Sequence, residues 1–207
     1  MQHPTALLEL QGLLAERNSH SDPKQQEAID ERIRARFQRP LAVLISDMSG
    51  FSRITEQRGI IHFLALIQRM HTLCVPQIEE CGGRLVKAEA DNLFAVFPDS
   101  RQALMAAIAM RAACAKDAAD RVPDSRISLA IGIGYGPILD IDGHDFFGDE
   151  VNRASKLGED IAETGEILLT PAAAQGLPPE HLEPARQRIS NIDLAYFRVT
   201  DSTLETA

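Results

Sequence analysis

The sequence lacks the features that mark secreted, membrane-spanning and nucleic-acid-binding proteins. Its three cysteines are odd in number and form no Cys-x-x-Cys pair, which favours reduced thiols in a cytosolic protein over a disulfide framework. Its apolar runs, such as residues 41–45 and 63–67, are far shorter than the roughly 20 residues that cross a bilayer. The N-terminus has no basic segment followed by an apolar one, so no signal peptide is predicted. We therefore expect a soluble, cytoplasmic protein without a membrane span.

Positive charge is also scarce. The chain has 21 Lys and Arg against 30 Asp and Glu, which gives a formal net charge of −9. This balance argues against binding to nucleic acid or to an anionic membrane, because both need a basic face. A single nucleotide can still be held by a few local cations and metal ions. The 207 residues contain no internal repeat and fit one domain with a short appendage.

The first 38 residues differ in composition from the rest of the chain. Apolar residues mark one face of a short helix, at Leu7, Leu10, Leu13 and Leu14. Asp22 then offers an N-cap, and Pro23 follows in the first turn of a second, highly charged helix. We predict an N-terminal helical segment over 1–38, which packs on the domain or on a partner chain, and a single domain over 39–207.

After Pro40 the chain alternates short apolar runs with longer amphipathic stretches. The predicted elements are a strand over 41–46, a helix opening after 49, a helix over 60–78, strands over 84–90 and 93–97, a helix from 99 or 100 to about 116, strands over 127–134 and 138–141, a helix over 148–161, a strand over 167–169 and two strands within 186–200. The order β-α-α-β-β-α-β predicts an α+β fold of the ferredoxin-like split βαβ type, with an antiparallel sheet and helices on one face.

Three motifs within these elements carry the chemistry. The first is ISDMSGFS over 45–52, a strand followed by Asp-x-x-Gly-Phe-Ser. The second is GGRLVKAEAD over 82–91, and the third is GDEVNRASKL over 148–157. Together and in this order they resemble the class III adenylate/guanylate cyclase family over roughly 41–200. The resemblance implies a metal-dependent enzyme that converts ATP to cyclic AMP and pyrophosphate.

By this resemblance, Asp47 and Asp91 are the ligands of two divalent cations, Mg²⁺ or Mn²⁺, and the carbonyl group of Met48 assists. Such ions prefer carboxylate oxygens, and they can both activate the attacking hydroxyl and hold the triphosphate. The residues that open the following helix provide backbone N–H groups for phosphate oxygens, and they are Ser49, Gly50, Phe51 and Ser52. Taken singly, each aspartate could equally be a helix cap or a turn residue.

The resemblance also assigns the base-reading residues. Lys87 stands where the family has a lysine that donates to the adenine ring, and Asp145 stands where it has an acceptor for the exocyclic amino group. A donor and an acceptor in these places fit adenine and mismatch guanine, whose carbonyl would face the carboxylate. The alternative is a surface lysine and a loop aspartate.

Asn152 is expected to orient the ribose, and Lys156, one helical turn later, to reach the α-phosphate. The family has an arginine at the latter position, so the planar fork of the guanidinium is replaced by a single ammonium. Arg188, or its neighbour Arg186, would contact the terminal phosphates in place of a family lysine. Ala90 replaces a family glycine.

The segment from 137 to 152 is shorter than in many relatives, which insert a hairpin arm that wraps the partner subunit. We expect a homodimer with shared active sites, in which one chain supplies the two aspartates and the other the base, ribose and α-phosphate contacts. Two alternatives stay open. One is a catalytically silent module that binds a nucleotide, and the other is a cyclase that acts on GTP or on a pyrimidine triphosphate.

Overall fold

The computed structural model describes residues 5–189 and 192–200 of the chain. The strands are β1 (Gln38–Met48), β2 (Arg84–Glu89), β3 (Asn92–Phe97), β4 (Leu129–Asp140), β5 (Phe146–Phe147), β6 (Ile167–Leu169), β7 (Leu182–Ile189) and β8 (Ile192–Val199). The helices are α1 (Thr5–Ser19), α2 (Pro23–Phe37), α3 (Phe51–Arg58), α4 (Ile60–Glu80), α5 (Ser100–Ala118), α6 (Asp149–Ser155), the π-helical segment η2 (Lys156–Ile161) and α7 (Pro171–Ala174). Short 3₁₀ turns lie at η1 (Pro123–Ser125) and η3 (Pro179–His181).

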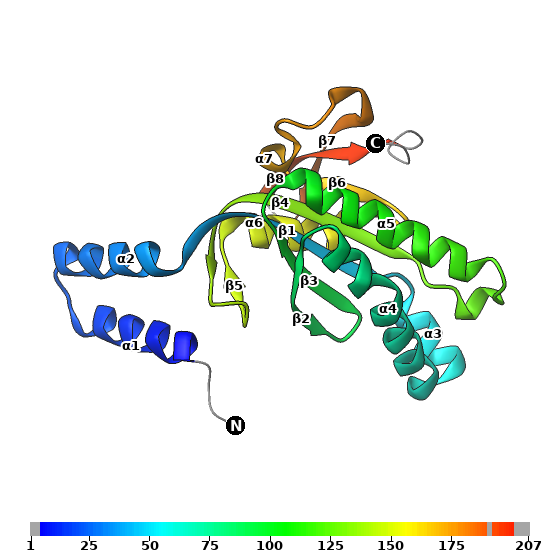
Figure 1. Cartoon of the computed structure of the whole chain (residues 1–207), viewed down its shortest axis with the longest axis horizontal. Helices are drawn as coiled ribbons and strands as arrows, with labels where there is room; N and C mark the ends of the chain where they lie inside the picture. The colour runs from blue at the N-terminus through cyan, green and yellow to red at the C-terminus, as the bar shows by residue number, and fades with distance from the viewer. Residues whose placement is uncertain (1–4, 190–191, 201–207) are drawn as a thin grey trace.

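The central sheet has the strand order β2-β3-β1-β4, and every neighbouring pair in it is antiparallel. With α3 and α4 between β1 and β2, and α5 between β3 and β4, this is the split βαβ arrangement, so the predicted α+β fold is confirmed. Figure 1 shows α4 and α5 side by side along the sheet. Their apolar faces form the main core with side chains of β1, β3 and β4.

One predicted break in the sheet is wrong. Two strands were expected over 127–134 and 138–141, whereas β4 runs unbroken from Leu129 to Asp140. The proline between them, Pro137, lies directly opposite Pro40 in the β1–β4 ladder. Because neither proline has an N–H group, this pair leaves no donor without an acceptor, and the ladder continues on both sides.

The helix pair α4–α5 covers only one face of the sheet, and α6 packs on the other face against β1 and β4. The expectation of helices on a single face is therefore wrong for α6. Gly132 in β4 allows this close approach, since a Cβ atom there would lie 2.1 Å from the carbonyl oxygen of Ala154. The sheet thus carries the third sequence motif on the face opposite the main core.

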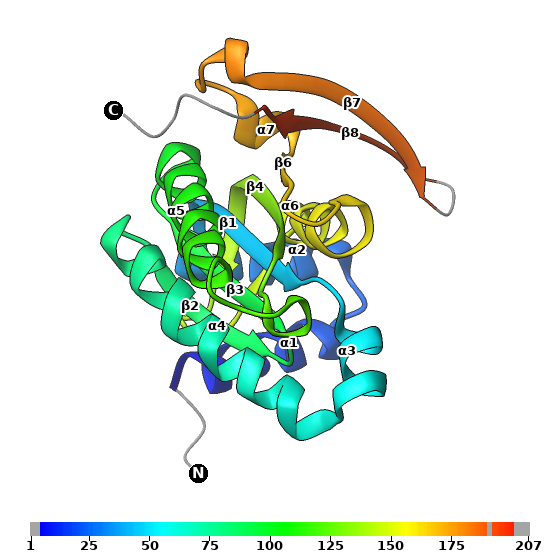
Figure 2. The same ribbon diagram turned by 90° about the vertical axis from the view of Figure 1, so that its right-hand side faces the viewer.

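Beyond β4 the sheet continues through β6, which is parallel to β4, and then through antiparallel β8 and β7. Figure 2 shows β7 and β8 as a curved hairpin that extends away from the helices. The strand β7 is the edge of the sheet opposite β2.

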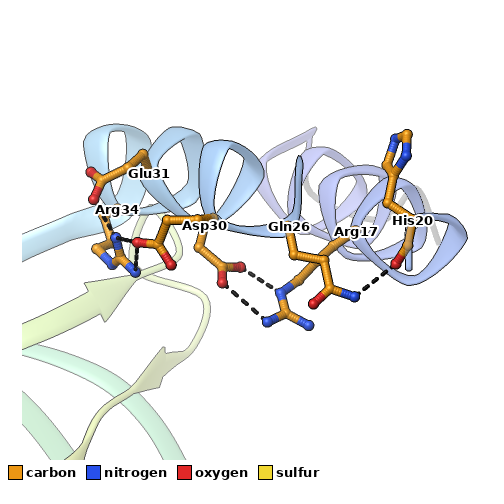
Figure 3. Close-up of polar contacts among 7 residues, drawn as sticks. Arg17, His20, Gln26, Asp30, Glu31 and Arg34 are labelled. Carbon is orange, nitrogen blue, oxygen red and sulfur yellow. Dashed lines mark hydrogen bonds and ion pairs between the residues drawn. The ribbon is translucent and has the colours of Figure 1, made fainter. Parts of the chain in front are cut away.

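The N-terminal helices form a hairpin that Figure 1 shows apart from α4 and α5. As predicted, Asp22 caps α2 by accepting a hydrogen bond from the N–H of Lys24 over 3.1 Å, and Pro23 is its first residue. Arg17 of α1 holds Asp30 of α2 through two hydrogen bonds of 2.5 and 3.1 Å (Figure 3). The chain passes from α2 into β1 without a loop. Among the helices of residues 5–189 and 192–200, none has both the length and the apolar character needed to cross a bilayer.

Candidate active site

Asp47 and Asp91 come from different strands and lie at the same end of the central sheet. Asp47 is the penultimate residue of β1 and lies opposite Asn92, the first residue of β3. Asp91 lies in the turn between β2 and β3, and its carbonyl oxygen accepts a hydrogen bond from the N–H of Met48 over 3.2 Å. The structure therefore brings together the two predicted metal ligands and the residue whose carbonyl was expected to assist them.

Burial and mutual repulsion disfavour the ionised form of the carboxyl groups at this site. Burial raises the pKa of Asp47 to about 6, and the nearby charges of Asp91 and Glu159 add to the rise. Burial likewise raises the pKa of Asp91 and of Glu159 above their ordinary values. A divalent cation would relieve this repulsion between carboxylates.

Glu159 was not predicted from the sequence. It lies in η2, and its Oε1 accepts a hydrogen bond from the side-chain amide of Asn92 over 3.4 Å. The sequence did hold a signal for it: Glu159 follows Asn152 by seven residues and Lys156 by three, spacings that put all three on one face of a helix.

The oxygen donors at this end of the sheet suit hard cations. Across residues 5–189 and 192–200, no group of three or more His, Cys, Asp and Glu side chains is arranged to hold a metal ion. Mg²⁺ commonly binds through only one or two carboxylates, together with water and substrate phosphates. The Oδ1 atom of Asn92 is also buried here and has no hydrogen-bond partner in the described part of the chain. The residues present therefore fit a Mg²⁺ or Mn²⁺ site that the substrate completes.

The predicted phosphate-binding helix begins beside these aspartates. Gly50 has a left-handed backbone, with φ of 99°, and α3 starts at Phe51. The N–H of Ser49 donates to the carbonyl oxygen of Ser128 over 3.0 Å, which anchors the turn to the segment before β4. The helix therefore starts within the segment 49–52, which the sequence predicted to open it.

Lys87 and Asp145, the predicted base-reading residues, form an ion pair within one chain. The Nζ atom of Lys87 lies 3.2 Å from Oδ1 of Asp145 and 3.2 Å from Oε1 of Glu89, and 5.0 Å from the centre of the Phe94 ring. Burial lowers the pKa of Lys87, but hydrogen bonds to Asp145 and Glu89 outweigh it and raise the pKa above its ordinary value. The ammonium therefore stays charged. A register shift between Leu85 and Lys87 interrupts the β2–β3 ladder, and such bulges often direct side chains at active sites.

A tight turn joins β4 to the segment that carries Asp145. Asp142 and Gly143 both have positive φ angles, 46° and 82°, and the N–H of His144 donates to the carbonyl oxygen of Ile141 over 3.0 Å. These are the features of a type I′ hairpin turn with an Asp-Gly centre. The shortened arm expected from the sequence is thus a compact hairpin of β4 and β5.

The ribose and phosphate candidates lie on α6 and η2. Asn152 is exposed on α6, and Lys156 is the first residue of η2, with its Nζ atom 3.8 Å from Oδ2 of Asp160. Short π-helical segments are frequent at functional sites. Glu150, which the sequence analysis missed, holds α6 against the sheet, because its Oε2 accepts hydrogen bonds from the Thr170 hydroxyl over 2.5 Å and from the N–H of Tyr135 over 3.2 Å.

The last two positions singled out in the sequence are Arg188 and Ala90. Arg188 lies on β7 at the far edge of the sheet, where its Nε atom is 4.0 Å from Oδ1 of Asp193. Within a single chain it is therefore distant from the other predicted site residues. Ala90, in the turn before Asp91, has a φ of 51°, the left-handed region that favours glycine.

Known proteins share sequence and fold with this chain. Residues 34–194 match the family model described as the adenylate and guanylate cyclase catalytic domain. A curated adenylate cyclase from Streptomyces coelicolor is 30% identical over 149 residues, which are 72% of this chain and 37% of that protein. The chain therefore spans little more than a third of that relative's length.

Solved structures show the same fold. The crystal structure of an adenylate/guanylate cyclase/hydrolase from Silicibacter pomeroyi has a TM-score of 0.67 and 30% identity, and the match covers 80% of this chain and 98% of that one. The adenylyl cyclase CyaB from P. aeruginosa has a TM-score of 0.66 and 22% identity, with 82% and 98% covered. The latter similarity supports the fold alone.

Proposed function

Because the chain belongs to the adenylate and guanylate cyclase catalytic domain family, we propose that it converts ATP to 3′,5′-cyclic AMP and pyrophosphate. The catalytic domain would span 39–207 and follow the helical segment 1–38. The protein would work in the cytoplasm, where thiols such as those of its three cysteines stay reduced.

The observation that carries the choice of ATP is the contact of 3.2 Å between Lys87 and Asp145. The two side chains present a donor and an acceptor side by side, and each is about a third exposed or less, so both remain open to a ligand. Adenine offers a ring nitrogen that accepts and an amino group that donates, which matches this pair. Guanine presents a carbonyl oxygen where the amino group would be, and Asp145 would repel it.

At the other end of the site, Asp47 and Asp91 would hold two divalent cations, with the Met48 carbonyl as a further oxygen ligand. Bound cations of this kind lower the pKa of a hydroxyl and neutralise a triphosphate. The start of α3 would receive phosphate oxygens on its free N–H groups. Asn152 would orient the ribose, and Lys156 would stabilise the charge that develops on the α-phosphate as pyrophosphate leaves.

We further propose that two chains share each site across a two-fold axis. The carboxylates of one chain would face the base-reading pair, Asn152 and Lys156 of the other. Arg188, which lies far along the sheet in its own chain, would contact the terminal phosphates in this arrangement.

The direct test is incubation of the purified protein with ATP, GTP, CTP and UTP, each with Mg²⁺ or Mn²⁺, followed by chromatography of the products. We expect cyclic AMP as the main product. Asp145→Asn adds an amide N–H that can donate a hydrogen bond to the carbonyl oxygen of guanine. The ratio of kcat/KM for ATP to that for GTP should therefore fall about tenfold. Asp149→Asn makes the same charge change at an exposed position on α6 and should leave the ratio unchanged.

A nucleotide-binding module without turnover is the second candidate, because Lys156 replaces an arginine with a single ammonium. Binding of ATP without any cyclic product, under either metal, would favour this module and contradict the proposed enzyme. A cyclic product from GTP or from a pyrimidine triphosphate alone would contradict the choice of base.

A further inference from the structure

The turn that precedes Asp145 is held by the N-terminal helices. Arg36, near the end of α2, binds the carboxylate of Asp142 with both terminal nitrogens, over 3.1 and 2.6 Å. The Nε atom of the same guanidinium donates to Glu9 of α1 over 3.1 Å. One arginine therefore joins both N-terminal helices to the centre of the β4–β5 turn.

The neighbour of Asp142 strengthens this attachment. Ile141 is fully buried, and it packs among apolar side chains of α1 and α2, including Leu10, Ile33 and Phe37. It belongs to this N-terminal cluster rather than to the main core beside the central sheet. Its N–H also donates to the carbonyl oxygen of Asp145 over 2.9 Å, so a displacement of Ile141 would move the backbone of Asp145.

Strand β2 holds the other side of the same turn. Arg84, three residues before Lys87, donates to Oδ2 of Asp140 over 2.9 Å, and Oδ1 of Asp140 accepts from the N–H of Gly143 over 3.0 Å. Gly143 leaves room for this contact, because a Cβ atom there would lie 2.2 Å from the Arg84 guanidinium. The turn is thus fixed between α2 and the strand that carries Lys87.

We propose that Arg36 and Asp142 are positioning residues for base selection, which tie the α1–α2 hairpin to the turn and so set Asp145 against Lys87. This inference rests on the proposed function. A single exposed ion pair stabilises a protein little, but here two parallel hydrogen bonds and the burial of Ile141 act on one turn of four residues. Discrimination between two purines depends on placing the acceptor to within about half an ångström.

Two variants test the link, both in the full chain. Arg36→Gln removes the guanidinium, and Asp142→Asn removes the charge while keeping a residue type that tolerates the φ of 46°. Arg17→Gln is the matched control, because it breaks the two hydrogen bonds to Asp30 within the same hairpin (Figure 3). The measured quantity is the ratio of kcat/KM for ATP to that for GTP.

We expect both variants to lower this ratio about 3- to 10-fold, and the double variant to lower it no further, because the two residues act as one unit. The Arg17→Gln ratio should stay within about twofold of the parent, since sites without shared partners act independently. A ratio that is unchanged in Arg36→Gln and Asp142→Asn, or that changes equally in Arg17→Gln, overturns the proposal.

Amide hydrogen exchange of Ile141 and His144, whose N–H groups donate to backbone carbonyls at the turn, gives a readout that does not require turnover. Both amides should exchange faster in Arg36→Gln and Asp142→Asn, and unchanged exchange overturns the proposal. If the parent forms no cyclic product from any nucleotide, the proposed function fails, and selectivity is then measured as the ratio of the Kd values for ATP and GTP. A lower binding ratio with faster exchange still supports the positioning role, whereas absence of nucleotide binding overturns it.

Discussion

The backbone N–H of Met48 donates to the carbonyl oxygen of Asp91 over 3.2 Å, and this bond ties the end of β1 to the β2–β3 turn. Asp47 immediately precedes this bond, so the backbone itself places the two carboxylates near each other. Glu159 approaches from η2 and adds a third negative charge. The fold therefore maintains a charge repulsion that only a cation or a proton can relieve.

Asp47→Asn should stabilise the metal-free protein at pH 7.5. The folded-state pKa of Asp47, about 6, is higher than its ordinary value of 3.8, so between pH 4 and 6 the folded chain holds a proton that the unfolded chain has lost. The free energy of unfolding therefore falls as the pH rises through this range and stays level above it. Since solvent screens this half-buried group, we expect a rise in Tm of only about 2–4 °C, or roughly 1 kcal/mol, in the variant.

Thermal unfolding of metal-free protein between pH 4 and 8 measures this effect. The slope between pH 4 and 6 should flatten in Asp47→Asn, and catalytic activity should be lost. Asp149→Asn removes a charge from an exposed position and is the control. An Asp47→Asn variant with the Tm and pH profile of the parent would contradict the electrostatic account.

Mixing two inactive variants should restore activity if the sites are shared. Asp47→Ala and Asn152→Ala alter the two sides of the proposed site. In a heterodimer one site receives both defects and the other receives none, so an equal mixture should recover about a quarter of the parent activity. Subunit exchange is followed with two affinity tags. Heterodimers that co-purify but remain inactive would mean that each site is built within one chain.

The sequence predicted most of the fold where local patterns decide structure. The cap at Asp22, the helix start after Gly50 and the β2–β3 hairpin all follow from short-range rules of capping and periodicity. The placement of Asp47 beside the turn at Asp91 agrees with the predicted split βαβ fold, in which β1 and β3 are neighbours.

What the sequence could not predict depends on contacts between distant residues. Arg36 and Asp142 are 106 residues apart, and no local pattern links a helix end to a hairpin turn. The packing of α6 on the second face depends on the space left at Gly132. Nothing in the sequence around this glycine indicates that a helix packs against it. Glu159 lies two residues beyond the third motif, which ends at 157 and was interpreted only for Asn152 and Lys156.

Ala90→Gly should stabilise the protein. A left-handed backbone at a non-glycine residue costs about 1–2 kcal/mol, and the greater freedom of glycine in the unfolded chain offsets part of the gain. We expect a net gain of about 0.5–1 kcal/mol, or a Tm that is about 1–4 °C higher. Ala88→Gly is the control, because Ala88 is an exposed residue inside β2, and glycine there should lower the Tm. A lower Tm in Ala90→Gly would show that the turn carries no strain.

The last prediction concerns the cation at the third motif. Lys156 is partly exposed, with 39% of its side chain accessible, and it lies one helical turn after Asn152. If its ammonium acts on charge that develops at the α-phosphate, Lys156→Ala should lower kcat about 10²- to 10³-fold with little change in KM. Lys156→Arg should retain or raise kcat, because the guanidinium fork can hold two phosphate oxygens.

A matched control separates this role from a general loss of surface charge. Arg153 lies three residues earlier on α6, is half-exposed, and faces Glu150 at 3.6 Å. Because Glu150 is fixed by Thr170 and by the N–H of Tyr135, loss of Arg153 should leave α6 in place. Arg153→Ala should therefore keep the parent kcat. Steady-state kinetics with ATP and Mn²⁺ measure all three variants. Equal kcat values for Lys156→Ala, Arg153→Ala and the parent would exclude Lys156 from the site, because a cation that contacts the transition state cannot be removed without a loss of rate.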